Sequence, residues 1–285
     1  MKPKSPSNPL ITPLQKKTSF FYPLLLLPKD QREGMESLYR FCWIADDIAD
    51  NTEPSAFKRE KLSVFKKNLS LALAGKAQAP LFITFQKIIR QFALSSEPLW
   101  RIVKGVERDL KPIRFKKFVD LHRYALQVAG GPGIVSMEIF GFKDKAHRDY
   151  AENLGVFLQL VNITRDYRED MALGRQYFPE EDFKRFRLNA RQIGENNPHW
   201  KSFVNFQLDR AWSYLEKAQK SLTHRQLSRL YTAEAIASVY VKLHHKLKTN
   251  PDQILKGRMS LSSADKLLSV IGASVRCYLW KRAGR

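Results

Sequence analysis

Two clusters of acidic residues have the type and spacing that a divalent cation could use. The first lies in the run Asp46-Asp47-Ile-Ala-Asp50. Residues four apart project from one side of a helix, so Asp46 and Asp50 stack, while Asp47 is turned away by about 100°. Like charges at this spacing weaken a helix by roughly a few tenths of a kcal/mol. Tyr39 and Trp43 extend the same stripe, so the carboxylates continue a face that is otherwise apolar.

The second cluster lies in the segment 159–170. Asn162, Asp166 and Asp170 are spaced i, i+4 and i+8, and Gln159 is close to this stripe. Mg²⁺ prefers octahedral oxygen ligands, and it usually takes one or two carboxylates together with substrate phosphate oxygens. Two such stripes facing each other across a helical cavity would hold a metal cluster over a diphosphate.

The alternative for either cluster alone is a solvated helix face, which is the usual role of an acidic pair. Two aligned stripes, each on a helix with an apolar face, argue against that alternative. The chain has a net charge of +21 and a pI near 10.0, which points to an anionic partner. Part of the excess is local, since residues 241–285 contain ten Lys or Arg and only two Asp.

Helical spacing dominates the chain after Pro28. Met35, Leu38, Tyr39, Cys42 and Trp43 recur at three-and-four spacing, as one buried helix face should. Further helices are predicted at about 56–74, 80–93, 98–110, 115–140, 146–173, 200–225, 228–248 and 261–282, with turn-forming residues between them.

These patterns predict one all-α domain of eight or nine helices over residues 19–285, preceded by a flexible basic lead-in over residues 1–18. No alternating strand pattern, repeat or glycine-rich dinucleotide turn is evident. The apolar run between Pro23 and Pro28 is far shorter than the ~20 residues of a spanning helix. Cys42 and Cys277 are far apart, which argues against a disulfide framework and makes a reducing cytoplasm the default.

With these residues in view, the chain resembles the squalene/phytoene synthase family from about Ser19 to Lys266. The resemblance is carried by ordered blocks at 19–22, 27–42, 46–50, 124–133 (YALQVAGGPG), 159–170 and 174–179. Within the family, the stretch from 128 to 141 looks most like bacterial hopanoid-pathway presqualene diphosphate synthases. The fold implied is a helical bundle of the isoprenoid (terpenoid) synthase type with a central cavity.

The reaction that this resemblance implies joins two prenyl diphosphates head to head with Mg²⁺. One diphosphate ionises, and the allylic cation is attacked by the 2,3-double bond of the second molecule, which gives a cyclopropyl diphosphate. The implied metal ligands are Asp46, Asp50, Asn162, Asp166 and Asp170, and Tyr124 and Arg165 would act in catalysis. The other implied substrate-binding residues are Ser19, Phe20, Tyr39, Arg40, Trp43, Val128, Ala129, Gly133, Gln159, Arg175, Tyr177, Tyr240 and Arg258.

Two positions depart from the family pattern. Trp43 stands where most members carry an Arg that binds diphosphate. Arg40, nearly one turn earlier, could replace that cation, or the indole face could stabilise an allylic cation. Pro132 replaces the usual aliphatic residue. Because proline lacks an N–H and clashes with the preceding turn, the stretch Gly130–Gly133 is expected to break or kink its helix.

The leading functional hypothesis is synthesis of presqualene diphosphate from two farnesyl diphosphates. Squalene, dehydrosqualene and phytoene synthesis stay open, the last from geranylgeranyl diphosphate, and NADPH would be needed only if the reaction continues to squalene. A non-catalytic binding or assembly protein on the same fold is a second class. A nucleic-acid binder has no motif to support it. The basic charge favours peripheral contact with an anionic membrane from the cytoplasmic side, and the oligomeric state stays open.

Overall fold

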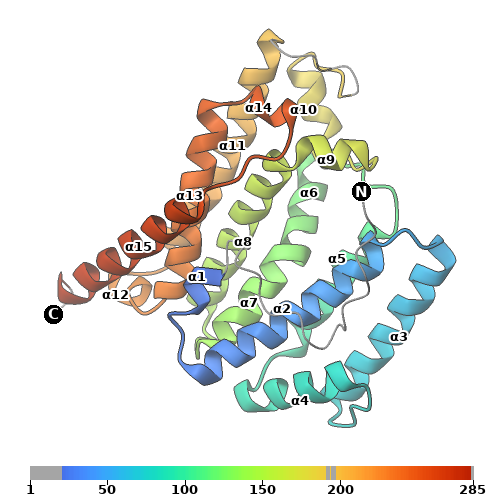
Figure 1. Ribbon diagram of the computed structural model, residues 1–285, viewed down its shortest axis with the longest axis vertical. Helices are drawn as coiled ribbons and strands as arrows, with labels where there is room; N and C mark the ends of the chain where they lie inside the picture. Colours follow the sequence, from blue (N-terminus) through green and yellow to red (C-terminus); the bar gives the residue numbers. More distant parts are fainter. Residues whose placement is uncertain (1–20, 191–192, 194–196, 284–285) are drawn as a thin grey trace.

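The computed structural model describes residues 21–190, 193 and 197–283, and this part of the chain is built from helices (Figure 1). The expected all-α fold is confirmed. The long helices are α2 (Lys29–Asp50), α3 (Ser55–Leu73), α4 (Pro80–Phe92), α5 (Ser96–Asp109), α8 (Lys145–Arg165), α11 (Pro198–Lys220), α13 (Tyr231–Thr249) and α15 (Ser263–Ala283). The shorter ones are α1 (Phe21–Leu24), α6 (Phe118–Ala125), the π-helical turn η1 (Leu126–Gly130), α7 (Gly131–Ile139), α9 (Tyr167–Ala172), α10 (Glu180–Arg185), α12 (His224–Leu227) and α14 (Gln253–Lys256).

The number of helices is larger than the eight or nine expected from the sequence. The segment 115–140 forms three successive helical pieces, and the segment 146–173 divides at Asp166. The remaining additions are helices of four to six residues (α1, α10, α12 and α14). Helices this short carry too few residues to show a periodic apolar face, so the sequence pattern does not reveal them.

Two apolar clusters form the interior. The first joins α2, α3, α4 and α5 and includes a group of aromatic rings, in which Phe41 stacks on Phe85 at a centroid distance of 4.6 Å. The second, larger cluster joins the helices from α6 to α15. The helix α7 belongs to both, because Val135 and Ile139 pack in the first cluster while Ile134 and Met137 pack in the second.

The stretch Gly130–Gly133 does not break the helical path. It follows the π-helical turn η1, after which the amide of Gly131 still donates to Leu126 O, and Pro132 is the second residue of α7. Small residues let this region approach its neighbours closely. A Cβ on Gly155 would lie 2.7 Å from the carbonyl oxygen of Ala129, and a Cβ on Gly133 would lie 2.9 Å from that of Ala151. The backbones of η1 and α7 therefore pack directly on α8.

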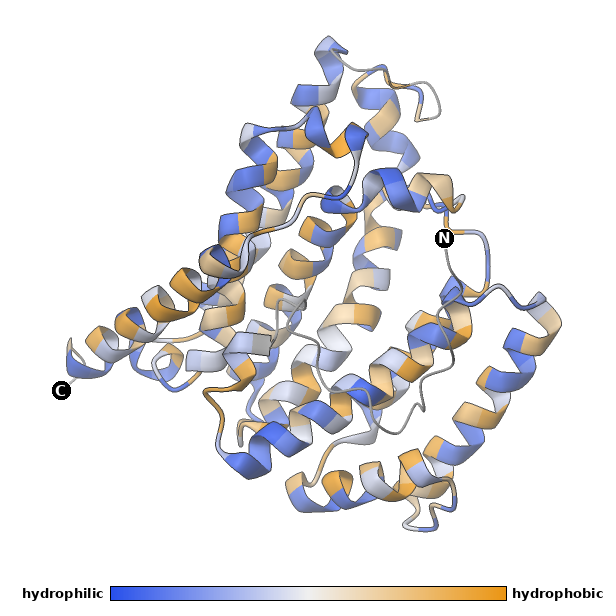
Figure 2. Ribbon diagram, in the orientation of Figure 1, coloured by the Kyte–Doolittle hydropathy of each residue, from blue (hydrophilic) through white to orange (hydrophobic). Residues whose placement is uncertain are grey.

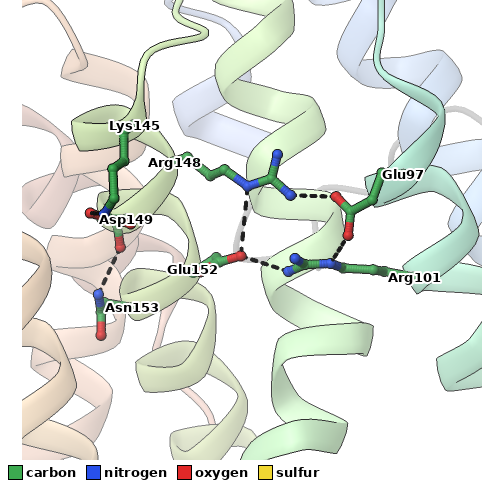
Figure 3. Close-up of polar contacts among 7 residues, drawn as sticks. All are labelled: Glu97, Arg101, Lys145, Arg148, Asp149, Glu152 and Asn153. Atoms are coloured by element: carbon green, nitrogen blue, oxygen red, sulfur yellow. Dashed lines mark hydrogen bonds and ion pairs between the residues drawn. The ribbon is translucent and has the colours of Figure 1, made fainter.

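A network of ion pairs joins α5 to α8 on the side of these helices shown in Figure 3. Arg101 of α5 donates to Glu152 of α8 at 2.6 Å and to Glu97 of its own helix. Arg148 of α8 in turn donates to Glu97. These pairs hold the two helices that border the cavity described below.

Candidate active site

A cavity of about 450 Å³ lies between the two apolar clusters. Its walls come from α2, α5, α6, η1, α8 and α9, from the segment after α9, and from the loop between α14 and α15. The lining residues are Asp46, Asp50, Asp109, Tyr124, Val128, Gln159, Asn162, Ile163, Arg165, Asp166, Asp170, Arg175, Tyr177 and Arg258. The two acidic clusters singled out by spacing therefore border one space.

The first wall is the C-terminal end of α2 together with the end of α5. The apolar positions of α2 are buried in the first cluster, which presents Asp46 and Asp50 to the cavity. In α5, Leu99, Ile102 and Val106 are buried, and Asp109 continues their stripe three residues beyond Val106. Three carboxylates from two helices thus line this side.

The second wall is the junction of α8 and α9. Asp166 ends α8 and precedes α9, with φ −96° and ψ 9°. The hydrogen-bond path continues through the junction, since the amide of Asp166 donates to Asn162 O at 2.8 Å and the amide of Asp170 donates to Asp166 O at 2.9 Å. The predicted stripe of Asn162, Asp166 and Asp170 is therefore retained although the helix changes direction.

Arginine side chains neutralise part of this acidity. Arg165 donates to both carboxylate oxygens of Asp166, and the Arg258 guanidinium lies 3.0 Å from the same carboxylate. Arg175 donates to Asp50 at 2.5 Å across the cavity. The cavity thus combines carboxylates with three cations, as a site for a metal and an anion requires.

The position of Arg258 depends on contacts between α9 and the loop that follows α14. Arg168 of α9 donates to the carbonyl oxygens of Leu255 and Lys256 at 2.7 and 2.8 Å. The backbone amide of Arg258 donates to Glu169 at 2.8 Å. These bonds fix the loop beside the second acidic cluster.

Three of the carboxyl groups have a strongly raised pKa. Desolvation and the neighbouring Asp109 and Asp50 carboxylates raise the pKa of Asp46 to about 7, although cavity solvent reaches its side chain. Desolvation also raises the pKa of Asp109 to about 7, against the lowering effects of Tyr124 and Arg175. Desolvation and Asp166 raise the pKa of Asp170 to about 7. Additional positive charge in the cavity would relieve this strain on the ionised forms.

The floor of the cavity contains a tyrosine pair beside Asp109. The Tyr124 hydroxyl donates to Asp109 Oδ2 at 3.2 Å, and the rings of Tyr124 and Tyr177 lie 5.6 Å apart. Asp109 Oδ1 is buried and has no hydrogen-bond partner among the described residues. Val128 and Ile163 add apolar surface to the lining.

The donor set fits a metal ion that binds together with a phosphate group. Within the described residues, no three Asp, Glu, His or Cys side chains lie close enough to hold an ion by themselves. The carboxylates come instead as pairs on facing walls. Mg²⁺ commonly takes only one or two protein carboxylates and completes its coordination with water and substrate phosphate oxygens, so Asp46, Asp50, Asp166 and Asp170, with Asn162, are suited to that role.

Some residues expected at the site lie elsewhere. Tyr240 is behind the lining, where its hydroxyl donates to Asn162 Oδ1 at 3.1 Å. Tyr39 is half-buried near Asp46. Desolvation raises the pKa of Tyr39, and the Asp46 carboxylate raises it further. Arg40, Trp43, Ala129 and Gly133 do not line the cavity, and Ala129 and Gly133 lie instead where η1 and α7 pack on α8. Ser19 and Phe20 fall outside the described residues.

The expectation that Trp43 belongs to the buried face of its helix is wrong. Its side chain is 38% exposed, whereas Met35 and Leu38 are buried. Position 43 is eight residues from Met35, and at 3.6 residues per turn it is rotated by about 80° from Met35, to the edge of the buried stripe. Trp43 is not among the residues that line the cavity, and its part in substrate binding stays a prediction.

Two lining residues, Asp109 and Ile163, were not singled out from the sequence. Asp109 has a signal of the kind that revealed Asp46, since it continues the apolar stripe of its own helix. A lone acid at the end of a helix is too common to be chosen on that basis. Only the fold brings it beside Tyr124.

Comparison with known proteins agrees with this architecture. The model of the squalene/phytoene synthase family matches residues 14–265. Among solved structures, the chain superposes on a dehydrosqualene synthase in complex with a ligand with a TM-score of 0.75, at 20% identity, covering 92% of this chain and 91% of that one. The squalene synthase HpnC from Alicyclobacillus acidocaldarius gives a TM-score of 0.68 at 22% identity, covering 94% and 89%.

Curated relatives include phytoene synthases. The 15-cis-phytoene synthase of Synechococcus elongatus is 26% identical over 272 residues, which span 90% of this chain and 88% of the relative. That of Synechocystis is 26% identical over 264 residues, or 88% and 78% of the two chains. Members of this family are prenyltransferases that bind prenyl diphosphates with divalent metal ions. From the matched length, the fold and the cavity together, the chain belongs to the squalene/phytoene synthase family.

Proposed function

We propose that the protein catalyses the Mg²⁺-dependent head-to-head condensation of two farnesyl diphosphates to presqualene diphosphate. The observation that carries this proposal is the single cavity in which two facing acidic pairs and three arginines surround a space beside apolar side chains. A diphosphate needs cations, and a prenyl chain needs apolar surface. A purely structural acidic patch would need neither.

The residues have distinct roles in this proposal. Asp46, Asp50, Asp166 and Asp170 would hold Mg²⁺, which stabilises the charge that grows on a departing diphosphate. Three arginines would bind diphosphate oxygens in place of their present carboxylate partners. Arg175 would leave Asp50, and Arg165 and Arg258 would both leave Asp166. Arginine suits this exchange because its planar fork binds carboxylate and phosphate in the same way.

Ring closure requires that a proton leave the carbon of the first substrate that has formed the new C–C bond. The C–O bond of the first substrate breaks and its electron pair leaves with the diphosphate. The double bond of the second substrate then forms the new C–C bond, and loss of a proton closes the cyclopropane. We assign proton acceptance to Tyr124 with Asp109 behind it, supported by their 3.2 Å hydrogen bond and their place in the cavity lining.

The second candidate is phytoene synthesis from geranylgeranyl diphosphate. It is favoured by the relatives from Synechococcus and Synechocystis, whose names are 15-cis-phytoene synthase. Dehydrosqualene and squalene synthesis would extend the farnesyl reaction, and the latter would also consume NADPH.

The test is product analysis of purified protein with farnesyl or geranylgeranyl diphosphate and Mg²⁺, with and without NADPH. A C30 cyclopropyl diphosphate from farnesyl diphosphate alone would support the proposal. A C40 hydrocarbon would instead support phytoene synthesis. A C30 hydrocarbon would indicate that the enzyme continues to dehydrosqualene or squalene. Absence of condensation with either substrate in a folded sample would favour the non-catalytic binding or assembly protein.

Two variants on neighbouring helices sharpen this test. Asp170→Asn should abolish Mg²⁺-dependent condensation, because it removes one carboxylate of the second acidic pair. Asp149→Asn is the matched control, since the Asp149 carboxylate of α8 pairs with Lys145 at 2.6 Å, far along the helix from the cavity. Equal loss in both variants would contradict the proposed roles.

Contact with an anionic membrane from the cytoplasmic side stays a prediction from the net charge of +21. Among the described helices, none combines the length and the apolar character needed to cross a bilayer.

A further inference from the structure

The outer face of α15 carries a stripe of large apolar side chains that no other described residue covers. The α15 stripe consists of Leu267, Leu268, Ile271, Val275, Tyr278 and Leu279, whose side chains are 46–61% exposed. Single exposed apolar residues are normal on protein surfaces, whereas a contiguous group marks an interaction site.

The spacing of the stripe makes it one continuous surface. Its members are separated by three or four residues, so they fall within about 120° of the helix circumference. From Leu267 to Leu279 the stripe is about 18 Å long, at a rise of 1.5 Å per residue. In Figure 1, α15 runs along the edge of the molecule toward the C-terminus, and Figure 2 shows apolar residues recurring along it up to a hydrophilic end.

The opposite face of α15 is already anchored in the fold. Val270, Ala273 and Cys277 are buried in the larger apolar cluster or beside it. Arg276 donates to the buried Glu234 at 3.2 Å and to Ser238 at 3.0 Å. The helix is therefore held in place by one side, and its stripe faces outward as a consequence of that docking.

A second apolar surface lies close to this helix. The short helix α1 packs against both α13 and α15. Leu25 and Leu26, which directly follow α1, are both exposed. The exposed apolar area thus extends beyond one helix.

The charge beyond the start of the stripe is basic. Residues 266–285 contain five Lys or Arg and no Asp or Glu, and Asp265 in the first turn of α15 is paired with Lys242. Lys281 and Arg282 are exposed at the end of the stripe, and the Arg282 guanidinium lies 4.9 Å from the Tyr278 ring centroid. The neighbouring helix α12 adds the exposed Arg225.

We propose that the α15 stripe, with Leu25 and Leu26, is the surface by which the protein inserts into the interface of an anionic lipid bilayer. Apolar side chains on one face with flanking Lys and Arg are the features of a helix that lies in the plane of a membrane. Anionic headgroups complement the basic flank, because each Lys or Arg near the surface is attracted to the negative potential of the leaflet.

A second copy of the chain fits this surface less well. A pair of copies would bring two proteins of net charge +21 together along helices whose one acid, Asp265, already pairs with Lys242 at 2.7 Å. The bilayer supplies both the apolar contact and the opposite charge. This inference does not depend on the proposed reaction, because insertion requires no turnover.

The test compares two double variants for binding to vesicles, measured by flotation without substrate. Leu268→Gln/Val275→Gln removes part of the stripe. Phe57→Gln/Val64→Gln on α3 is the matched control, since these side chains are 58% and 54% exposed on the opposite side of the molecule from α15 (Figure 1). The probes are vesicles of phosphatidylcholine alone and of phosphatidylcholine with 30% phosphatidylglycerol.

The wild type and the α3 variant should bind the vesicles that contain phosphatidylglycerol, and added salt should weaken the binding. The stripe variant should bind them at least tenfold more weakly with an unchanged melting temperature. Lys281→Gln/Arg282→Gln should weaken binding to the vesicles that contain phosphatidylglycerol and leave binding to pure phosphatidylcholine vesicles unchanged. Equal binding by the stripe and α3 variants, absence of wild-type binding, or a wild-type dimer that the stripe variant converts to monomer would each overturn the proposal.

Discussion

Replacing Asp109 by Asn should stabilise the metal-free protein, and the gain should grow with pH. Desolvation raises the pKa of this carboxyl from 3.8 to about 7, so the folded state binds a proton that the unfolded state releases. The free energy of unfolding therefore falls as the pH rises from 3.8 to about 7 and stays reduced above it. An amide cannot ionise, and its oxygen can still accept from Tyr124, so the variant escapes this loss.

The size of the effect follows from the pKa. A rise of about three pH units corresponds to about 4 kcal/mol. Because Asp109 is only half-buried, solvent screening reduces this to about 2 kcal/mol at pH 8. At pH 5 the unfolded carboxyl is ionised and the folded one is mostly protonated, so the same reasoning gives about 1 kcal/mol.

The assay is denaturant unfolding at pH 5 and pH 8 without Mg²⁺ or diphosphate. Asp120→Asn on α6 is the control, because Asp120 is an aspartate close to the surface beside Arg123. It should change the free energy of unfolding by less than about 0.5 kcal/mol at either pH. A stabilisation of Asp109→Asn that is the same at both pH values, or a destabilisation at pH 8, would refute the reasoning.

Three further predictions concern the cavity and the packing beneath it. Arg175→Gln removes the cation that bonds Asp50, so binding of inorganic diphosphate with Mg²⁺ should weaken at least tenfold by calorimetry; unchanged affinity would exclude Arg175 from the anion site. Mg²⁺ alone should bind weakly and diphosphate should increase its affinity in the same experiment, whereas tight binding of Mg²⁺ alone would contradict the paired-carboxylate arrangement. Gly155→Ala should lower the free energy of unfolding by about 1–3 kcal/mol, because its Cβ would lie 2.7 Å from the Ala129 backbone. Gly272→Ala in α15, where a Cβ meets nothing within 4 Å, is the control and should be neutral or slightly stabilising, and equal destabilisation of both would contradict the close packing.

Local spacing predicts much of this molecule. The three-and-four periodicity places α2 and most other long helices to within a few residues, since an apolar face is a property of the helix itself. It also aligns Asp46 with Asp50, because stacking at i, i+4 needs no tertiary information. The all-α fold follows from the same signals and is confirmed.

The rest depends on contacts between distant segments. The ion pair of Arg175 with Asp50 joins residues 125 positions apart, and no local pattern encodes it. Asp109 joins the cavity only because α5 packs beside α2 and α6 carries Tyr124 to it. The exposure of Trp43 was missed because a stripe of five residues has no defined edge in sequence. The assignment of metal and substrate roles to the cavity residues stays a prediction.

The division of the interior into two apolar clusters makes the molecule modular. Asp46 and Asp50 depend on the packing of Phe41 and its aromatic neighbours, whereas Asp166 and Asp170 depend on the other cluster. Mutations that change the packing of one apolar cluster should therefore leave the carboxylates held by the other cluster in place. The helix α7 is an exception, because its buried side chains belong to both clusters, and the short helix α1 also reaches both through Tyr22 and Leu24. Substitutions in α7 should be tolerated least during divergence or redesign of the chain.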